Sequence, residues 1–267
     1  MLKKILIWAG SIIAIIYVVI ITLIYFTQEK LLFYPEKLES NFIFKYDIPF
    51  EELNVNVDDN IAINGLLFKA DSAKGLVFYL HGNAGSLASW GRAAKPFIDN
   101  NYNCFIFDYR GYGKSGGKIT SENQLHEDIQ KVYNELIKNY DEKNVIITGY
   151  SLGTGLAAKL ASQNHPQKLI LKAPYNNMSY MLNLHYPLLP EFALRYTLTT
   201  DQFLKKVGVP ITIFHGDKDK LIPIECSYKL KEDFKGSDKL IILKGADHHK
   251  MSENKDYQLE INKILSQ

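Results

Sequence analysis

The chain has 267 residues, of which 46% are hydrophobic, 22% charged and 12% aromatic. These fractions are typical of a folded globular protein and exclude a disordered or collagen-like chain. The 31 basic residues nearly balance the 29 acidic ones, so the net charge of +2 gives no general argument for nucleic-acid binding. Cys104 and Cys226 are too few for a disulfide framework and lack the clustered partners of a zinc site. One bridge between them is the alternative if the domain lies outside the cytosol, but because Cys104 lies in a strand-like apolar run, we expect two free thiols.

An uncharged, strongly apolar run extends from Ile5 to Phe26. At about 1.5 Å per residue, these roughly 22 residues would form a helix about 33 Å long, enough to cross a hydrocarbon core of about 30 Å. A cleaved signal peptide is the main alternative, but the run is too long for one and ends without small residues. A buried core helix is a weaker alternative, because the run has no polar face. We therefore predict that residues 1–30 form an uncleaved signal anchor.

The charges around this run predict its orientation. Lys3 and Lys4 precede the run, whereas the charges that follow it nearly cancel. Since the more basic flank stays cytoplasmic, we expect a single-pass membrane protein with a cytoplasmic N-terminus. The bulk of the chain would then lie on the non-cytoplasmic side.

Strand-like and helix-like segments alternate beyond a connector over residues 31–51. The runs Leu53–Val57 and Ile61–Phe68 flank an Asp-Asp-Asn turn and predict a hairpin. The other predicted strands are Gly75–Leu80, Asn103–Phe107, Asn144–Thr148, Lys168–Leu171, Pro210–Phe214 and Lys239–Leu243. The predicted helices are Ala88–Asn100, Ser121–Tyr140, Leu152–Gln163, Ile222–Phe234 and Glu253–Leu265. Apolar strands separated by helices predict one α/β domain over residues 52–267, with a mostly parallel sheet covered on both faces.

The stretch Gly149–Gly153 has the pattern Gly-x-Ser-x-Gly between a predicted strand and a predicted helix. In this context the two glycines permit a tight, strained turn, and the serine oxygen projects at the positive end of the helix. The pattern alone is common in turns. Its position between strand and helix therefore carries the prediction that Ser151 is a nucleophile.

A serine nucleophile needs a base and an orienting acid, expected in the chain order Ser, Asp or Glu, His. Asp217 and Asp219 follow one predicted strand; Asp217 lies close enough to the strand end to cap the turn, so Asp219 is favoured as the acid. His248 and His249 follow the next strand, and His248 is favoured as the base with His249 as its rival. A metal site made from these residues is disfavoured because they lack a known metal-ligand spacing, and we expect no cofactor.

Acyl transfer also needs two hydrogen-bond donors for the tetrahedral oxyanion. One is expected from the backbone N–H of Leu152, directly after the nucleophile. The second is expected from the Gly-rich loop His81–Gly85, with the N–H of Asn83 as the candidate and a plain turn as the alternative. We interpret His81 as a residue that fixes this loop. Another glycine-rich stretch, Asp108–Gly116, lacks a phosphate-loop pattern and is interpreted as a structural turn.

Together these motifs resemble the α/β-hydrolase superfamily, and within it the BEM46-like, ABHD13/ABHD17-like group of serine hydrolases. The stretches that carry the resemblance are Phe33–Pro35, His81–Gly85, Asp108–Gly116, Gly149–Gly153, His215–Pro223 and Gly245–His249. The resemblance implies an α/β-hydrolase fold with a sheet of about eight strands. It also implies a triad of Ser151, Asp219 and His248, with Asn83 and Leu152 in the oxyanion hole. The chain departs from this pattern at Asp247, where relatives often carry glycine before the histidine.

Residues 174–207 lie where such folds insert a lid. The segment is rich in Tyr, Leu and Met, and Pro187 and Pro190 interrupt any single long helix. We expect a short helical lid. Packing on the sheet and lining the substrate site are equally open roles for it.

The first functional hypothesis is a membrane-anchored serine hydrolase that cleaves carboxylic esters or thioesters of acylated or lipid-like substrates through an acyl-enzyme. An anchored active site meets lipids at high local concentration. A serine peptidase with the same triad and a non-catalytic binding scaffold are the alternatives. The expected partners are an acyl substrate and a membrane, not a nucleic acid.

Overall fold

Eight strands form the main sheet in the computed structural model, which describes residues 1–266. Their order across the sheet is β10-β9-β8-β7-β4-β6-β3-β2. The strands are β2 (Phe50–Asp58), β3 (Ile61–Phe68), β4 (Leu76–Leu80), β6 (Asn103–Phe107), β7 (Val145–Tyr150), β8 (Lys168–Lys172), β9 (Ile211–Gly216) and β10 (Lys239–Leu243). The six strands from β6 to β10 along this order are parallel, whereas β3 is antiparallel to β2 and β6. The predicted α/β fold with a mostly parallel sheet is confirmed.

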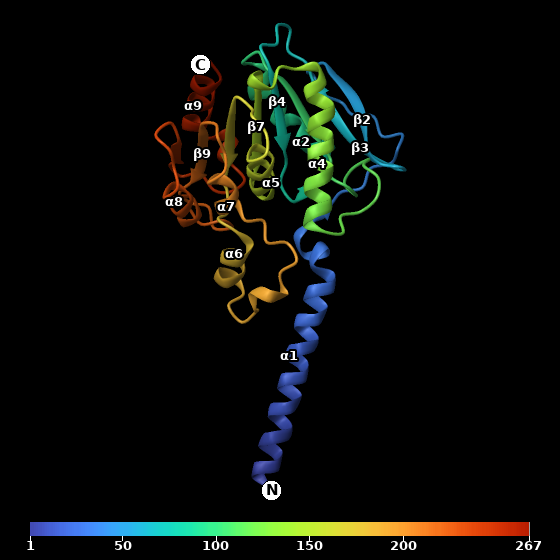
Figure 1. Ribbon diagram of the computed structural model, residues 1–267, viewed down its shortest axis with the longest axis vertical. Helices are drawn as coiled ribbons and strands as arrows, with labels where there is room; N and C mark the ends of the chain where they lie inside the picture. The colour runs from blue at the N-terminus through green and yellow to red at the C-terminus, as the bar shows by residue number, and fades with distance from the viewer. Residues whose placement is uncertain (267) are drawn as a thin grey trace.

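Helices cover both faces of this sheet (Figure 1). One face carries α4 (Glu122–Leu136), α5 (Leu152–Ala161), α7 (Thr200–Leu204) and α8 (Glu225–Lys231). The other face carries α2 (Leu87–Trp90), α3 (Lys95–Ile98) and α9 (Lys255–Ser266). Successive side chains of a strand point to opposite faces, so Phe78 of β4 packs in the first core and Tyr79 in the second. Apolar residues throughout each central strand are therefore required to fill both cores.

Two predicted helices are shorter than their sequence patterns indicated. The predicted helix Ala88–Asn100 is divided into α2, a 3₁₀ helix η1 (Gly91–Ala94) and α3. The ring of Tyr46 packs so closely on Gly91 that a Cβ there would lie 2.4 Å from it. The predicted helix Ile222–Phe234 begins only at Glu225, as α8. The Tyr46 ring that packs on Gly91 comes from the connector, about 45 residues earlier in the chain.

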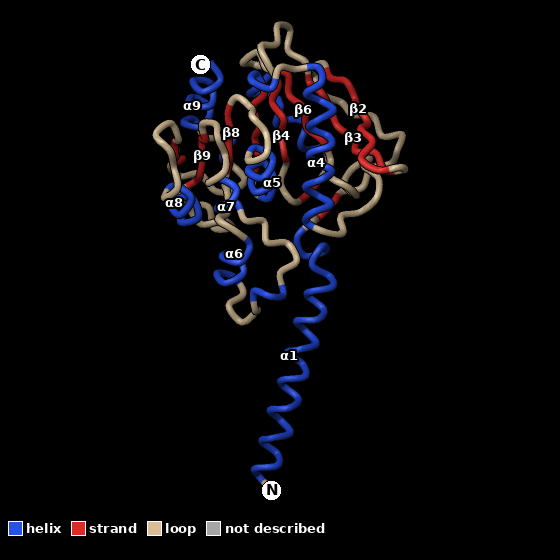
Figure 2. The backbone as a smooth tube through the Cα atoms, in the orientation of Figure 1, coloured by secondary structure: helices blue, strands red, loops and turns tan. Residues whose placement is uncertain are grey.

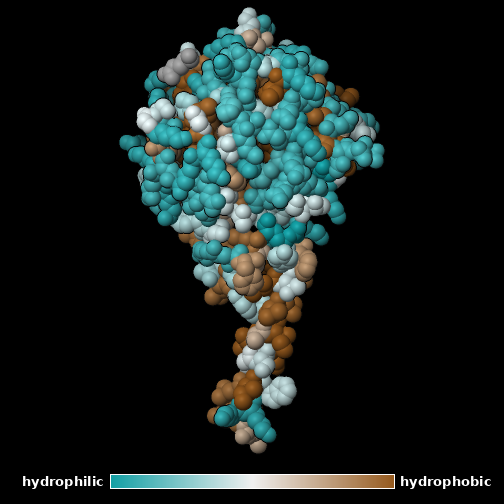
Figure 3. Space-filling model, in the orientation of Figure 1, coloured by the Kyte–Doolittle hydropathy of each residue, from teal (hydrophilic) through white to brown (hydrophobic). Residues whose placement is uncertain are grey.

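A long helix, α1 (Leu2–Leu32), projects from the domain as a stalk (Figure 1). Its backbone leaves helical geometry at Thr27, directly after the uncharged run. The most apolar part of the helix is not buried by any other part of the protein. Figure 3 shows this apolar surface along the stalk, below a largely hydrophilic domain. A helix of this length and hydropathy fits a transmembrane helix.

The connector over residues 31–51 packs on the domain instead of only leading into it. Its short strand β1 (Tyr34–Pro35) pairs in parallel with β5 (Ala84–Gly85). Phe33 and Phe44 are both buried, each in one of the two cores. The stalk is therefore joined to the domain at the loop between β4 and α2.

The lid segment lies beside the upper part of the stalk (Figure 2). It contains α6 (Met178–His185) and the 3₁₀ helix η4 (Glu191–Ala193), which are separated by the two prolines of the predicted break. The Tyr17 hydroxyl of α1 donates a hydrogen bond to the carbonyl oxygen of Leu188 at 2.7 Å. The lid therefore contacts the part of α1 that was predicted to span the membrane.

Candidate active site

Ser151 stands in a strained turn between β7 and α5. Its backbone angles are φ 53° and ψ −120°, which are unfavourable for a residue with a side chain. A Cβ on Gly149 would lie 2.3 Å from the carbonyl oxygen of Gly153. A Cβ on Gly153 would lie 2.2 Å from the carbonyl oxygen of Leu80 in β4. Only glycine therefore fits at either position, and the turn presents the serine where the strand ends.

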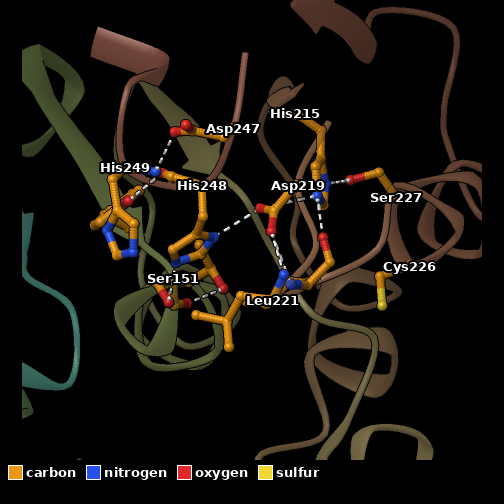
Figure 4. Close-up of polar contacts among 12 residues, drawn as sticks. Ser151, His215, Asp219, Leu221, Cys226, Ser227, Asp247, His248 and His249 are labelled. Carbon is orange, nitrogen blue, oxygen red and sulfur yellow. Dashed lines mark hydrogen bonds and ion pairs between the residues drawn. The ribbon is translucent and has the colours of Figure 1, made fainter. Parts of the chain in front are cut away.

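Three strand ends bring Ser151, His248 and Asp219 together (Figure 4). The Oγ atom of Ser151 lies 3.0 Å from Nε2 of His248. Nδ1 of the same imidazole lies 2.6 Å from Oδ2 of Asp219. All three residues are buried. Because β7, β9 and β10 are parallel, the loops that follow them meet at one edge of the sheet, and the hydrogen-bond chain forms there.

The carboxylate of Asp219 is held by its own loop and by two imidazoles. Its Oδ1 accepts hydrogen bonds from the backbone N–H groups of Leu221 and Ile222, at 2.9 and 2.8 Å. Burial raises the pKa of this group, but the nearby His215 and His248 rings outweigh burial and hold the pKa well below its usual value. Asp219 is therefore ionised and can orient an imidazole.

His215 supports this acid, a role that the sequence analysis did not assign. Its Nε2 lies 2.8 Å from the carbonyl oxygen of Ile222 and 3.6 Å from Oδ2 of Asp219. Because a carbonyl oxygen only accepts, Nε2 carries a proton. Its Nδ1 lies 2.6 Å from the Ser227 hydroxyl. The available signal was the spacing of four residues between His215 and Asp219 across the strand exit.

The two rival residues lie outside the hydrogen-bond chain. Asp217 accepts a hydrogen bond at 2.7 Å from the N–H of Gly245, so it caps the turn after β10. His249 is exposed, and its backbone N–H donates to Oδ1 of Asp247 at 3.0 Å. The same oxygen accepts a hydrogen bond from the N–H of Lys250 at 2.9 Å. Asp247 therefore stabilises the loop that carries His248, which accounts for an acidic residue at this departure from the family pattern.

The loop between β4 and α2 is fixed on both sides of Asn83. The Nδ1 atom of His81 donates to the carbonyl oxygen of Gly82 at 2.7 Å, and that carbonyl belongs to the same peptide group as the Asn83 N–H. The carbonyl oxygen of Asn83 accepts a hydrogen bond from the Tyr112 hydroxyl at 2.6 Å. Leu152 is the first residue of α5, directly after the nucleophile. The assignment of Asn83 and Leu152 to the oxyanion hole stays a prediction, and the loop has the rigidity that such a role requires.

Tyr150 and Lys172 form a second group beside His248, which was not predicted from the sequence. The Tyr150 hydroxyl donates a hydrogen bond to the backbone carbonyl of His248. The Lys172 ammonium lies 4.7 Å from the centre of the Tyr150 ring and donates to the Ser252 hydroxyl at 2.6 Å. Burial lowers the pKa of Lys172 to about 8. The available signal was a lysine directly after the apolar run Leu169–Leu171.

The cysteines and metal-ligating side chains form no further centre in the described part of the chain. Cys104 and Cys226 are buried free thiols, as expected. Across residues 1–266, no group of three or more His, Cys, Asp or Glu side chains is arranged to hold a metal ion.

Comparison with known proteins relates this chain to hydrolases. A family model described as serine aminopeptidase, S33, matches residues 71–200. An uncharacterized protein of Acanthamoeba polyphaga mimivirus is 30% identical over 221 residues, which cover 74% of this chain and 75% of that protein. The lysophosphatidylserine lipase ABHD12 of Danio rerio is 29% identical over 180 residues, and human protein ABHD12B is 32% identical over 179 residues. These matches cover 60% and 59% of this chain but only 47% and 49% of the two vertebrate proteins.

Two solved structures share the fold. An esterase of Pyrococcus furiosus has a TM-score of 0.71 at 18% identity and covers 88% of this chain and 97% of its own. Est1E from Butyrivibrio proteoclasticus, solved with ferulic acid bound, has a TM-score of 0.63 at 18% identity and covers 80% and 96%. At this identity the likeness concerns the fold alone. The narrower BEM46-like, ABHD13/ABHD17-like group stays a prediction.

The geometry predicts unequal roles for the two acids of the loop after β9. We expect Asp219→Asn to lower kcat by at least about 10³-fold, since an amide cannot stabilise the imidazolium or hold its tautomer. Asp217→Asn is the matched control and should stay within about tenfold of the unchanged protein, because it affects only the turn. Steady-state hydrolysis of a soluble ester measures both. Equal losses in the two variants would contradict the assignment of Asp219.

The lowered pKa of Lys172 predicts that the free energy of unfolding depends on pH. Its pKa falls from the ordinary 10.5 to about 8 on folding, so between these values the unfolded chain binds more protons and stability rises with pH. Below about pH 8 both states are protonated and the buried charge destabilises the fold, by up to about 3 kcal/mol. We expect Lys172→Met to remove this rise in the thermal midpoint between pH 7.5 and 9.5. Lys239→Met, at the exposed start of β10, should retain it. A rise of equal size in all three proteins would contradict the prediction.

Proposed function

The chain belongs to the α/β-hydrolase superfamily, and from this membership we propose that it is a membrane-anchored serine hydrolase of acylated or lipid-like substrates. It would cleave carboxylic ester or thioester bonds. The observation that carries the proposal is the continuous hydrogen-bond chain from Ser151 through His248 to Asp219. A binding scaffold would have no need of a strained serine aligned with a base and an acid.

The proposed mechanism starts with attack of the Ser151 hydroxyl oxygen on the acyl carbonyl carbon. Nε2 of His248 accepts the hydroxyl proton, and Asp219 stabilises the resulting imidazolium. Collapse of the tetrahedral intermediate breaks the bond to the leaving group, which takes the proton from His248. A water molecule then attacks the acyl carbon of the acyl-enzyme while His248 accepts a proton from it. The carboxylic acid is released when His248 returns this proton to Ser151. The N–H groups of Asn83 and Leu152 would stabilise both oxyanions, and each such donor contributes about 3 kcal/mol.

The position of the lid supports the proposal that the substrate enters from the membrane. Leu188 and Phe192 are 83% and 78% exposed, and the backbone carbonyl of Leu188 accepts a hydrogen bond from the Tyr17 hydroxyl. Tyr17 precedes the end of the uncharged run by nine residues, or about 14 Å of helix. If α1 spans a bilayer, Leu188 lies at the depth of the hydrocarbon. Phe192 lies nearer the boundary, because the adjacent Ala193 accepts a hydrogen bond from Gln28, two residues beyond Phe26. The lid also reaches the acid loop, since Nε2 of His185 lies 3.2 Å from the carbonyl oxygen of Leu221.

A panel of esters and thioesters of graded acyl length tests the proposed chemistry. We expect the full chain in detergent micelles to hydrolyse the acyl substrates, and Ser151→Ala to lose at least about 10⁴-fold in kcat. A peptide anilide belongs in the panel because the matching family model is described as an aminopeptidase. Preferential cleavage of the anilide would favour the peptidase alternative. No turnover of any substrate, together with no labelling by a fluorophosphonate, would favour the scaffold.

A variant of the lid distinguishes an effect on the entry of substrate from the membrane from an effect on ester hydrolysis itself. Leu188→Asp should lower the rate on a long-chain ester embedded in vesicles by at least about tenfold relative to the rate on a soluble short ester. Leu259→Asp, on an exposed site of α9, is the matched control and should leave this ratio unchanged. An unchanged ratio in Leu188→Asp would count against delivery through the lid.

The charges before the uncharged run support an N-terminus in the cytoplasm and a catalytic domain on the other side. We expect the protein to resist carbonate extraction, and the domain to be cut by protease only from the non-cytoplasmic face of sealed vesicles. Digestion only from the cytoplasmic face would reverse this orientation. A mature chain that starts near Thr27 would replace the anchor with a cleaved signal peptide.

A further inference from the structure

A pocket of about 510 Å³ lies where α1 joins the domain. Its walls come from the end of α1, from the connector and from the loop between β6 and α4. We propose that this pocket binds the anionic phosphate headgroup of a membrane phospholipid. The proposal rests on the membrane anchoring proposed above, but it does not depend on the triad.

This pocket is separate from the catalytic centre. None of the residues that line it is Ser151, Asp219 or His248. Tyr112 lines the pocket and turns its hydroxyl away toward the carbonyl oxygen of Asn83. The Tyr112 side chain thus connects the pocket with the loop of the predicted oxyanion hole.

Three lysines at the pocket have no carboxylate partner. Lys30, Lys37 and Lys118 are exposed and form no ion pair with any residue from 1 to 266. Lys37 donates a hydrogen bond to the carbonyl oxygen of Ser115 at 3.3 Å, which leaves two of its ammonium donors available. Three uncompensated ammonium groups around one concave surface attract an anion.

The remaining charges of the pocket are neutralised within the protein. Arg110 is bound by Asp128, with Nη2 2.9 Å from Oδ1. Arg195 pairs with Glu29 at 2.8 Å, and Glu29 is the one acidic side chain that lines the pocket. These pairs hold the walls in place, and the excess positive charge comes from the three lysines.

The position and the apolar part of the walls favour a lipid over a free phosphate ion. Phe26, the last residue of the uncharged run, lines the pocket together with Phe33 and Ile119. If residues 5–26 span the hydrocarbon, Phe26 marks its boundary and the pocket opens at headgroup depth. The glycerol backbone and first methylenes of a phospholipid would contact these side chains, while its phosphate meets the lysines.

Binding of short-chain ether-linked phospholipids tests this site, because ether bonds cannot be hydrolysed by the proposed enzyme. The full chain in neutral detergent micelles is titrated calorimetrically with ether-linked phosphatidylglycerol, with ether-linked phosphatidylcholine, and with inorganic phosphate. We expect phosphatidylglycerol to bind at least tenfold more tightly than either of the others. Equal affinity for phosphatidylcholine, or for inorganic phosphate, would overturn the anionic-lipid assignment.

Two sets of charge variants locate the site. The triple variant Lys30→Gln, Lys37→Gln, Lys118→Gln should lose at least tenfold in affinity for phosphatidylglycerol, since each lysine near an anionic headgroup contributes roughly fivefold. The matched control is Lys143→Gln, Lys206→Gln, Lys239→Gln. These three lysines are exposed, lie outside the pocket and form no ion pair within residues 1–266. It should bind as the unchanged protein does. Equal losses in both triple variants would show general attraction by net charge and would overturn the proposal.

A variant that fills the pocket without removing charge makes the test independent of electrostatics. Thr120 is exposed and lines the pocket, so Thr120→Trp should occupy the space and lower the affinity for phosphatidylglycerol at least fivefold. Unchanged affinity in a variant with an unchanged thermal midpoint would place the lipid elsewhere and overturn the site.

Fluorophosphonate labelling of the unchanged protein reports separately on the triad. Labelling without lipid binding would contradict only this inference, and lipid binding without labelling would contradict only the proposed catalysis.

Discussion

The close approach of β7, β4 and α5 around Ser151 is the constraint on which the rest of the site depends. The serine adopts φ 53° because the helix starts directly at the strand end, and the backbone atoms of Gly149 and Gly153 approach within distances that exclude a Cβ. The cost of this conformation is met by the packing of the two apolar cores, which holds strand and helix together. Once the serine is placed there, the loops that follow β9 and β10 reach across the carboxyl edge of β8 and bring Asp219 and His248 to it.

Much of the site could be predicted because it follows the order of parallel strands. The motif at Gly149–Gly153 and the strands before Asp219 and His248 were enough to name the three residues that the structure brings together. The supporting residues could not be predicted in this way. Lys172 reaches Ser252, 80 positions further along the chain, and no local pattern encodes that distance. Such contacts depend on how β8 and the chain after β10 pack.

The fold, like the site, could be predicted where the local sequence decides the structure but not where distant contacts do. The ends of all eight strands were predicted to within about three residues. Continuous apolar runs located the central strands, because a strand buried on both faces needs such a run, whereas the turn between β2 and β3 located the hairpin. The helix predicted over Ala88–Asn100 changes to a 3₁₀ helix at Gly91, where the Tyr46 ring of the connector packs against the backbone. The connector itself has too little periodicity to predict, and its pairing with β5 is a tertiary event.

The attachment of the stalk gives the domain a defined face toward the membrane. The Asn83 side chain donates to the carbonyl oxygen of Leu32 at the end of α1, and Gln28 donates to the carbonyl oxygen of Ala193 in the lid. Asn83 follows β4 at the carboxyl edge of the sheet, and Ser151, Asp219 and His248 meet at the same edge (Figure 4). If α1 spans the bilayer, the edge that carries the predicted triad faces the lipid. The parallel sheet thus places Ser151, the predicted nucleophile, at the edge of the domain beside which the stalk, the predicted lid and the lysine-lined pocket also lie (Figure 1).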